Sequence, residues 1–108
     1  MDPSEFQRRS SDTLAAIEDA IDASGADFDY ETVNDVLTLE FASGTKIIIN
    51  KQSAADQIWV AARSGGFHFD YDATGDQWVC DSNGAELFAE LSRLIADQSG
   101  EPISLSRD

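Results

Sequence analysis

The chain has 108 residues, which fits a single domain over residues 1–108 that buries roughly two thirds of the surface its unfolded form exposes. Its 21 acidic and 7 basic side chains give a formal net charge of −14, which repels nucleic-acid phosphates and anionic lipid headgroups. These counts argue against nucleic-acid and membrane binding, and they favour cations and basic protein surfaces as partners.

Hydrophobic residues make up 42% of the chain and lie in patterned segments, so the sequence predicts a folded protein. The single cysteine, Cys80, excludes an intramolecular disulfide and is compatible with a reducing compartment. No apolar run approaches the ~20 residues that span a bilayer, and no signal-peptide pattern is present. We therefore expect a cytoplasmic protein. The N-terminus is too short and too acidic for an organellar transit peptide, which favours a bacterial or already processed chain.

The first element is predicted to be a helix from about residue 3 to residue 23. Asp2, Pro3 and Glu5 form a capping signature at its start, and Gly25 can take the left-handed conformation that ends a helix. At 100° per residue one side of this helix is apolar and the opposite side is acidic. The apolar residues are Phe6, Leu14, Ile17 and Ile21, and the acidic ones are Glu5, Asp12, Glu18, Asp19 and Asp22.

Between residues 27 and 80 the pattern changes to short β-rich runs separated by turn residues, which predicts an antiparallel meander. The expected strands are 30–33, 36–41, 46–50, 57–62, 67–71 and 77–80. The expected turns are Asn34-Asp35, Ser43-Gly44, 64–66 and 74–76.

A second amphipathic helix is predicted after the strands, capped by Ser82-Asn83 and stopped at Gly100. Its apolar side carries Leu87, Phe88, Leu91, Leu94 and Ile95. Both helices can bury their apolar sides if they pack near-parallel on one face of a twisted antiparallel sheet of five or six strands. The predicted fold class is therefore α+β, a two-layer α-β sandwich whose second sheet face meets solvent.

Trp59 is the first candidate for a binding role. If Ile58 and Val60 face the helices, alternation turns Trp59 to solvent, and the same parity turns Asn50 and Gln52 outward beside it. An exposed tryptophan beside amides is typical of a protein-binding hot spot. The residues alone leave open the reverse assignment, in which Trp59 belongs to the core.

The acidic side of the first helix, continued by the acids that follow it, is the second candidate. Carboxylate oxygens suit hard cations, but these acids lie on a convex, solvated surface without a histidine, so affinity and selectivity should be modest. Taken alone, the pattern favours a solvated face that keeps the protein soluble. We call these residues the acidic ridge: Glu18, Asp19, Asp22, Asp27, Asp29 and Glu31.

Other motifs give no sign of an enzyme. The run from Asp70 to Asp76 resembles the start of a calcium loop, but strands flank it and its twelfth position is Asp81, so it is interpreted as a hairpin turn. Gly65-Gly66 is interpreted as a turn and Cys80 as a small apolar filler. His68, the only histidine, has no catalytic partner in the sequence.

Three segments together resemble the frataxin signature, and the similarity covers essentially the whole chain. They are Thr45-Lys46-Ile47-Ile48-Ile49-Asn50-Lys51-Gln52, Gln57-Ile58-Trp59-Val60-Ala61 and Gly65-Gly66-Phe67-His68-Phe69-Asp70. Ser4-Glu5-Phe6 and the run from Gly75 to Asp81 extend the match. The chain is thus identified as a member of the frataxin family, in its bacterial branch.

The resemblance implies an α-β sandwich that binds Fe²⁺ or Fe³⁺ weakly on the acidic ridge and docks on the cysteine desulfurase and its iron–sulfur scaffold protein. It favours an outward Trp59 and implies a partner-binding set, the sheet patch, of Asn50, Gln52, Trp59 and His68. His68 stands where eukaryotic frataxins carry an arginine. Gln7 and the segment 23–25 depart from more metal-rich relatives, which predicts fewer or weaker iron sites.

The leading hypothesis is a non-enzymatic, monomeric regulator of iron–sulfur cluster assembly, with oligomers formed only in the presence of iron. One alternative is an iron-oxidising and iron-storing protein with weak ferroxidase-like activity, which would be slow because the sequence lacks the Glu-x-x-His pairs of di-iron bundles. The other is a small acidic secretion-type chaperone that dimerises through an apolar surface.

Overall fold

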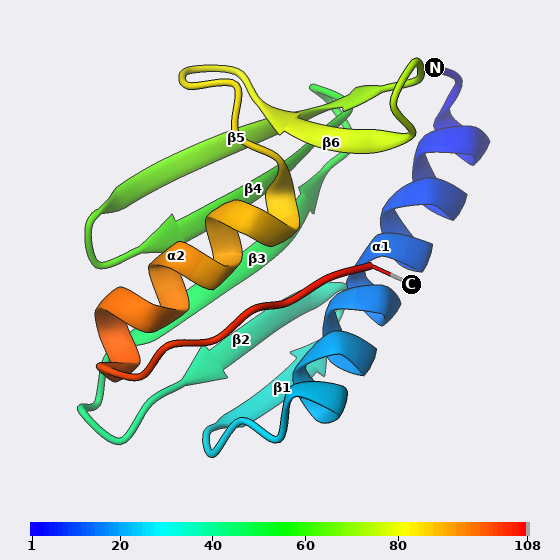
Figure 1. The fold of residues 1–108 in the computed structure, drawn as a ribbon. Helices are drawn as coiled ribbons and strands as arrows, with labels where there is room; N and C mark the ends of the chain where they lie inside the picture. Colours follow the sequence, from blue (N-terminus) through cyan, green and yellow to red (C-terminus); the bar gives the residue numbers. More distant parts are fainter. Residues whose placement is uncertain (108) are drawn as a thin grey trace.

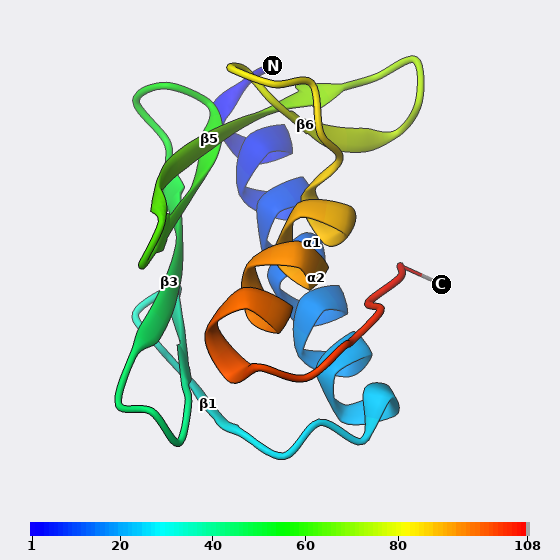
Figure 2. The same cartoon turned by 60° about the vertical axis from the view of Figure 1, so that its left-hand side comes forward.

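The computed structural model describes residues 1–107 and shows two helices packed on one face of a six-stranded antiparallel sheet (Figures 1 and 2). The sheet order β1-β2-β3-β4-β5-β6 follows the chain, so the predicted meander and α-β sandwich are confirmed. The elements are α1 (Pro3–Ser24), β1 (Asp29–Val33), β2 (Val36–Glu40), β3 (Lys46–Gln52), β4 (Gln57–Ala62), β5 (Gly65–Asp72), β6 (Gln77–Cys80) and α2 (Leu87–Ser99).

Helix α1 begins and ends on the predicted cap residues and extends one residue further than expected. The Asp2 carboxylate accepts a hydrogen bond from the Glu5 backbone N–H at 2.8 Å, and Pro3 occupies the first turn, where no N–H is needed. Gly25 ends the helix with φ of 71°. The predicted apolar stripe of Phe6, Leu14, Ile17 and Ile21 is buried.

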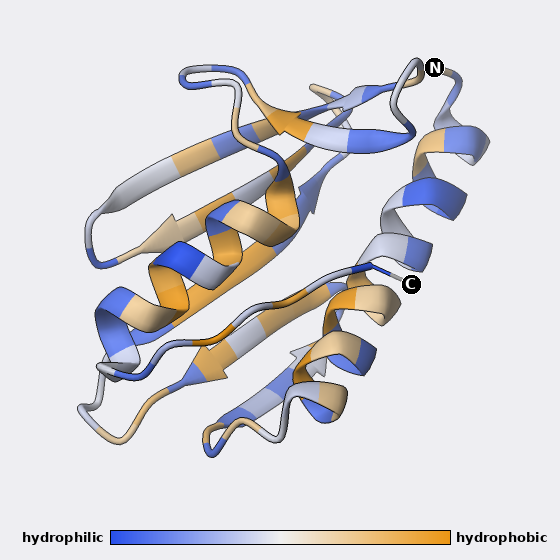
Figure 3. Ribbon diagram, viewed as in Figure 1, coloured by the Kyte–Doolittle hydropathy of each residue, from blue (hydrophilic) through white to orange (hydrophobic). Residues whose placement is uncertain are grey.

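The core lies between the helices and the inner sheet face, where hydrophobic residues gather (Figure 3). Alternation places Ile47, Ile49, Ile58 and Val60 inward with at most 1% exposure. Trp78 is also buried, and its indole N–H donates to Thr13 Oγ1 of α1 at 2.9 Å. Because that hydrogen bond satisfies the only polar atom of the indole ring, the tryptophan fixes α1 against the far edge of the sheet.

The observed turns differ from the predicted ones at one position. Asn34 and Asp35 form the predicted two-residue turn, with φ of 52° and 66°. Gly65 and Gly66, predicted as turn residues, instead pair with Ala62 and Ala61 as the start of β5. The prediction was wrong because the glycine is needed for the backbone conformation at the start of the strand. Gly65 has φ of 148°, which L side chains rarely adopt.

Helix α2 begins later than predicted. Its N-cap is Glu86, whose carboxylate accepts from the N–H groups of Phe88 and Ala89, and Ser82-Asn83 lies outside the helix. Residues 81–85 instead turn back on β6, where the Cys80 N–H donates to the Ala85 carbonyl at 2.8 Å. Neither helix within residues 1–107 is long and apolar enough to cross a membrane.

The segment after α2 runs back between the two helices, on their side away from the sheet (Figures 1 and 2). Leu105 is only 5% exposed there, and its N–H donates to Ser92 Oγ of α2 at 2.8 Å. Arg107 donates to Thr13 Oγ1 of α1 at 2.8 Å. This C-terminal segment, to which the sequence analysis assigned no role, therefore completes the core and links the helices.

Candidate functional site

The part of the acidic ridge on α1 is tied to the edge strand β1. Glu18 accepts a hydrogen bond from the Thr32 hydroxyl at 2.6 Å, and Asp22 accepts one from the Tyr30 hydroxyl at 2.7 Å. Asp19 is exposed beside them. Alternation along β1 turns Tyr30 and Thr32 toward the helix layer, which is why the two hydroxyls meet the carboxylates of α1.

The carboxylates raise the pKa of the Tyr30 phenol. The hydrogen bond to Asp22 raises the pKa of Tyr30 to about 12 from its ordinary 10.0, with further contributions from burial and from the charges of Asp22, Glu18 and Asp19. A negative phenolate would face three carboxylates there, so the neutral form is favoured. Tyr30 therefore reports on the charge of this part of the ridge.

Asp22→Ala is expected to lower the pKa of Tyr30 toward 10, because it removes both the hydrogen bond that raises this pKa most and the charge nearest to the phenol. The folded-state pKa lies above the unfolded one, so the stability contributed by Tyr30 is present below pH 10 and is lost as the pH rises through about 12. An NMR titration of the tyrosine ring carbons resolves Tyr30 from Tyr71. Asp19→Asn is the control, since it removes a charge but no hydrogen bond; an equal fall in both variants would contradict the assigned cause.

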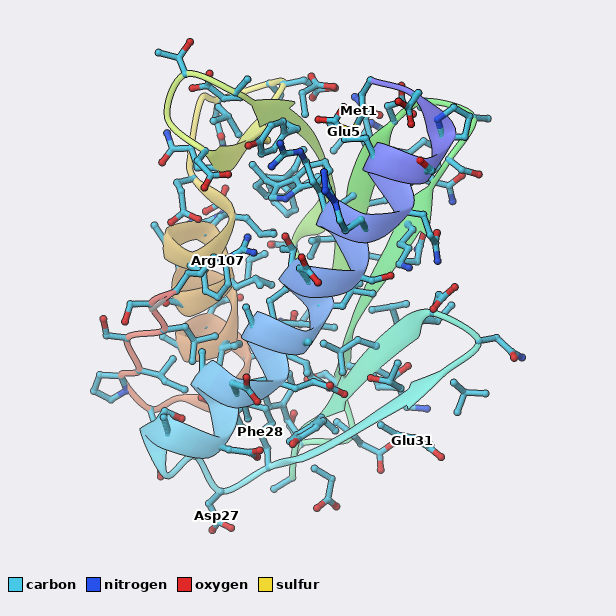
Figure 4. All side chains as sticks on the ribbon, turned by 90° about the vertical axis from the view of Figure 1, so that its right-hand side faces the viewer. Met1, Glu5, Asp27, Phe28, Glu31 and Arg107 are labelled. Carbon is cyan, nitrogen blue, oxygen red and sulfur yellow. The ribbon has the colours of Figure 1, made fainter. Side chains whose placement is uncertain are left out.

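The remaining ridge acids lie elsewhere. Asp29 and Glu31 pair with Glu40 and Thr38 of β2, so their side chains stand on the outer sheet face, opposite the face that meets α1. Glu40 itself lies 3.5 Å from the Lys46 ammonium. Asp27 is exposed on the loop after α1 and points away from the protein, well apart from Glu31 (Figure 4).

The edge strand thus divides the ridge, with helix acids on one side and strand acids on the other. Within the described residues 1–107, no three acidic, histidine or cysteine side chains converge closely enough to hold a metal ion. Glu18 and Asp22 also already accept hydrogen bonds from the protein, with which a cation would have to compete. These carboxylates fit loosely held, solvated cations and do not form a closed coordination site.

The residues of the sheet patch, in contrast, lie side by side. Asn50, Trp59 and His68 are direct cross-strand neighbours on β3, β4 and β5, all on the outer face. The rings of Trp59 and His68 stack with centroids 4.3 Å apart and planes 20° from parallel. Gln52 donates to Asn50 Oδ1 at 2.9 Å, which holds both amides beside the rings.

Three polar residues next to this patch were not predicted from the sequence to belong to it. Gln57 accepts the indole N–H of Trp59 at 2.8 Å and donates to Asp70 at 3.0 Å and to Asp81 at 3.3 Å. Asp81 also lies 3.9 Å from His68 Nδ1. Strand alternation, which places residues 57, 59, 68 and 70 on one face, could have identified Gln57 and Asp70. Asp81 follows the last strand, and its position depends on the turn after β6.

Tyr30, Thr32 and Glu40 are the corresponding omissions around the ridge. The alternation of residues 29–33 was sufficient to turn Tyr30 and Thr32 toward the helix layer. Their contacts with Asp22 and Glu18 required the helix position, which no local pattern specifies.

Comparison with known sequences agrees with the resemblance to the frataxin family. The profile of the frataxin-like domain family matches residues 1–101. A relative from Paraburkholderia phymatum, named iron–sulfur cluster assembly protein CyaY, is 43% identical over 98% of this chain and 99% of its own length. A relative of the same name from Vibrio vulnificus is 45% identical over 95% of this chain and 97% of its own.

Solved structures agree with the fold. Frataxin from Psychromonas ingrahamii superposes with a TM-score of 0.90 at 38% identity, covering 99% of this chain and all of that one. Trimeric frataxin from the yeast Saccharomyces cerevisiae, complexed with ferrous iron, gives a TM-score of 0.66 at 28% identity over 90% of this chain and 87% of its own.

Proposed function

Since the chain belongs to the frataxin family, we propose that it acts in iron–sulfur cluster assembly as a regulator that docks on the cysteine desulfurase and its scaffold protein and carries iron loosely on the acidic ridge. Its relatives bear the name of assembly proteins and not of enzymes. Iron would be the cargo of the ridge and not a resident cofactor; the yeast neighbour is complexed with ferrous iron.

The sheet patch is the observation that carries the docking proposal. Trp59 stacks on His68 and is held by Gln57 on a sheet face that neither helix covers (Figure 2). A ring fixed before binding loses little conformational entropy when a partner covers it. The amides of Asn50 and Gln52 add donors and acceptors at its side.

The acidic ridge supports the second part of the proposal. Its carboxylates attract a basic surface from a distance and accelerate association, an effect that falls as salt rises. A bound cation cancels part of this charge, so iron would tune the docking. The hydrogen bonds that Glu18 and Asp22 already accept favour weak and exchangeable iron binding.

The test is an affinity titration against a bacterial cysteine desulfurase, with and without ferrous iron and at two salt concentrations. The triple variant Glu18→Lys, Asp19→Lys, Asp22→Lys is expected to bind at least ~10-fold more weakly and to lose the response to iron, because it replaces attraction by repulsion. Unchanged binding of this variant would exclude the ridge as a contact.

A charge-matched control separates the ridge from net charge. Asp72→Lys, Asp97→Lys, Glu101→Lys makes the same change in net charge at positions outside the ridge and the patch, and it is expected to retain most of the affinity. The same samples test the alternatives. Oxygen uptake faster than that of free ferrous iron would favour an iron-oxidising store, and an iron-independent dimer would favour a chaperone.

A further inference from the structure

The free edge of the sheet at β1 is a second binding element. β1 is the first strand in the sheet order and pairs only with β2 (Figure 1). The two-residue turn with positive φ at Asn34 and Asp35 makes Val33 and Val36 the hydrogen-bonded pair that closes the hairpin. Bonded and non-bonded pairs then alternate, so the backbone groups of Tyr30 and Thr32 point away from β2.

Within residues 1–107, these outward groups have no strand to pair with. Among residues 1–107, no backbone hydrogen bond joins Tyr30 or Thr32 to an element other than the β1–β2 hairpin. Their side chains are anchored on α1 through Asp22 and Glu18, so the strand is held in an extended form. An ordered strand edge with free N–H and C=O groups is a template for an added strand.

Charge determines what that added strand can be. Acids flank the free edge on both faces of the sheet. Those on the helix side are Glu18, Asp19 and Asp22, and those on the outer side are Asp29 and Glu31. The nearby lysines, Lys46 and Lys51, lie 3.5 Å from Glu40 and Asp35 respectively. A strand whose side chains alternate between the two faces would meet carboxylates on both.

A second copy of this chain is a poor occupant. Antiparallel pairing of two β1 strands centred on Glu31 would set the two Glu31 carboxylates directly opposite each other, and each copy carries a net charge of −14. The acids therefore oppose self-association at this edge while favouring a basic strand.

We propose that the free edge of β1 binds an extended segment rich in lysine or arginine from a partner protein, as a seventh strand paired with the backbone of Tyr30 and Thr32. The inference goes beyond the proposed function, because it adds backbone pairing along β1 to the charge attraction of the acidic ridge and does not involve the sheet patch. It also requires neither iron nor cluster assembly.

The test uses the isolated chain and two capped seven-residue peptides rich in lysine, with lysines at both odd and even positions so that both faces of an added strand are basic. One of the two peptides is N-methylated at every backbone amide. The peptides carry the same charge, but the methylated one cannot donate backbone hydrogen bonds. At low salt the unmodified peptide is expected to bind about 10-fold or more tightly than the methylated one, given the worth of two or more backbone hydrogen bonds. It is also expected to slow hydrogen exchange of the Tyr30 and Thr32 amides, followed by NMR.

A matched pair of variants provides a second readout. Thr32→Pro removes the outward N–H without removing a hydrogen bond to β2, so it is expected to weaken binding of the unmodified peptide about 10-fold. Thr32→Ala keeps the N–H and is expected to bind this peptide as tightly as the parent chain does. If Thr32→Pro does not fold, the peptide pair still decides. Equal binding of the two peptides, unchanged amide exchange in the complex, or no binding at low salt would each overturn the proposal. Desulfurase docking is judged separately, by the titrations with the ridge and Trp59 variants.

Discussion

Leu105→Ala is expected to lower the free energy of unfolding by about 2–5 kcal/mol, the range found when a buried leucine is truncated and its neighbours cannot close the cavity. Leu105 is 5% exposed between α1 and α2, although it lies beyond the last helix. Its burial shields the sides of both helices that face away from the sheet. Urea unfolding followed by tryptophan fluorescence measures the loss.

Two further variants make this result specific. Ser104→Ala changes an exposed neighbour in the same segment and is expected to stay within about 0.5 kcal/mol of the parent. A chain that ends at residue 101 lacks Leu105 and the hydrogen bond from Arg107 to Thr13. Its free energy of unfolding should therefore fall at least as much as that of Leu105→Ala. Equal stability of all four proteins would mean that the C-terminal segment does not pack in solution.

Trp59→Ala is expected to weaken binding to the cysteine desulfurase or its scaffold protein by about 30-fold or more, corresponding to the roughly 2 kcal/mol or more that a central tryptophan contributes at an interface. The substitution removes the stacked ring on the outer face and leaves the core residues Ile58 and Val60 in place. The free energy of unfolding should therefore change by about 1 kcal/mol or less. Isothermal titration with the partner, alongside urea unfolding, separates the two effects.

Trp59→Phe is the matched control, because phenylalanine can still stack on His68 but lacks the N–H that donates to Gln57. It is expected to retain more affinity than Trp59→Ala. Unchanged binding of Trp59→Ala, together with loss of binding on charge reversal of the ridge, would place docking on the ridge alone and exclude the sheet patch.

The order and kind of the elements followed from local patterns. Asp2, Pro3 and Gly25 bounded α1 to within one residue, and alternation assigned Ile58 and Val60 to the core. Failures occurred where two local signals competed. Ser82-Asn83 resembles a helix cap, but the pairing of Cys80 with Ala85 extends the β6 turn and delays α2 to Leu87.

The candidate site, like the fold, was predictable only where local patterns determine the position of its residues. The sheet patch could be predicted because one parity rule places Asn50, Trp59 and His68 on a common face, and antiparallel register then brings them together. The acidic ridge was only partly predictable. Proximity in sequence suggested one continuous surface, whereas the edge strand separates Asp29 and Glu31 from the carboxylates of α1.

The sequence by itself determined the two amphipathic helices, the meander between them, the outward direction of Trp59 once Ile58 is inward, and an acidic charge that favours cations and basic partners. These properties depend on periodicity, turn chemistry and composition, which act over a few residues or over the whole chain. Only the tertiary structure decided that Leu105 packs between the helices, that Glu18 and Asp22 hold β1, and that the β1 edge remains open. Each of these depends on which surfaces pack together across long separations in the chain, and packing selects among arrangements that local preferences leave equally favourable.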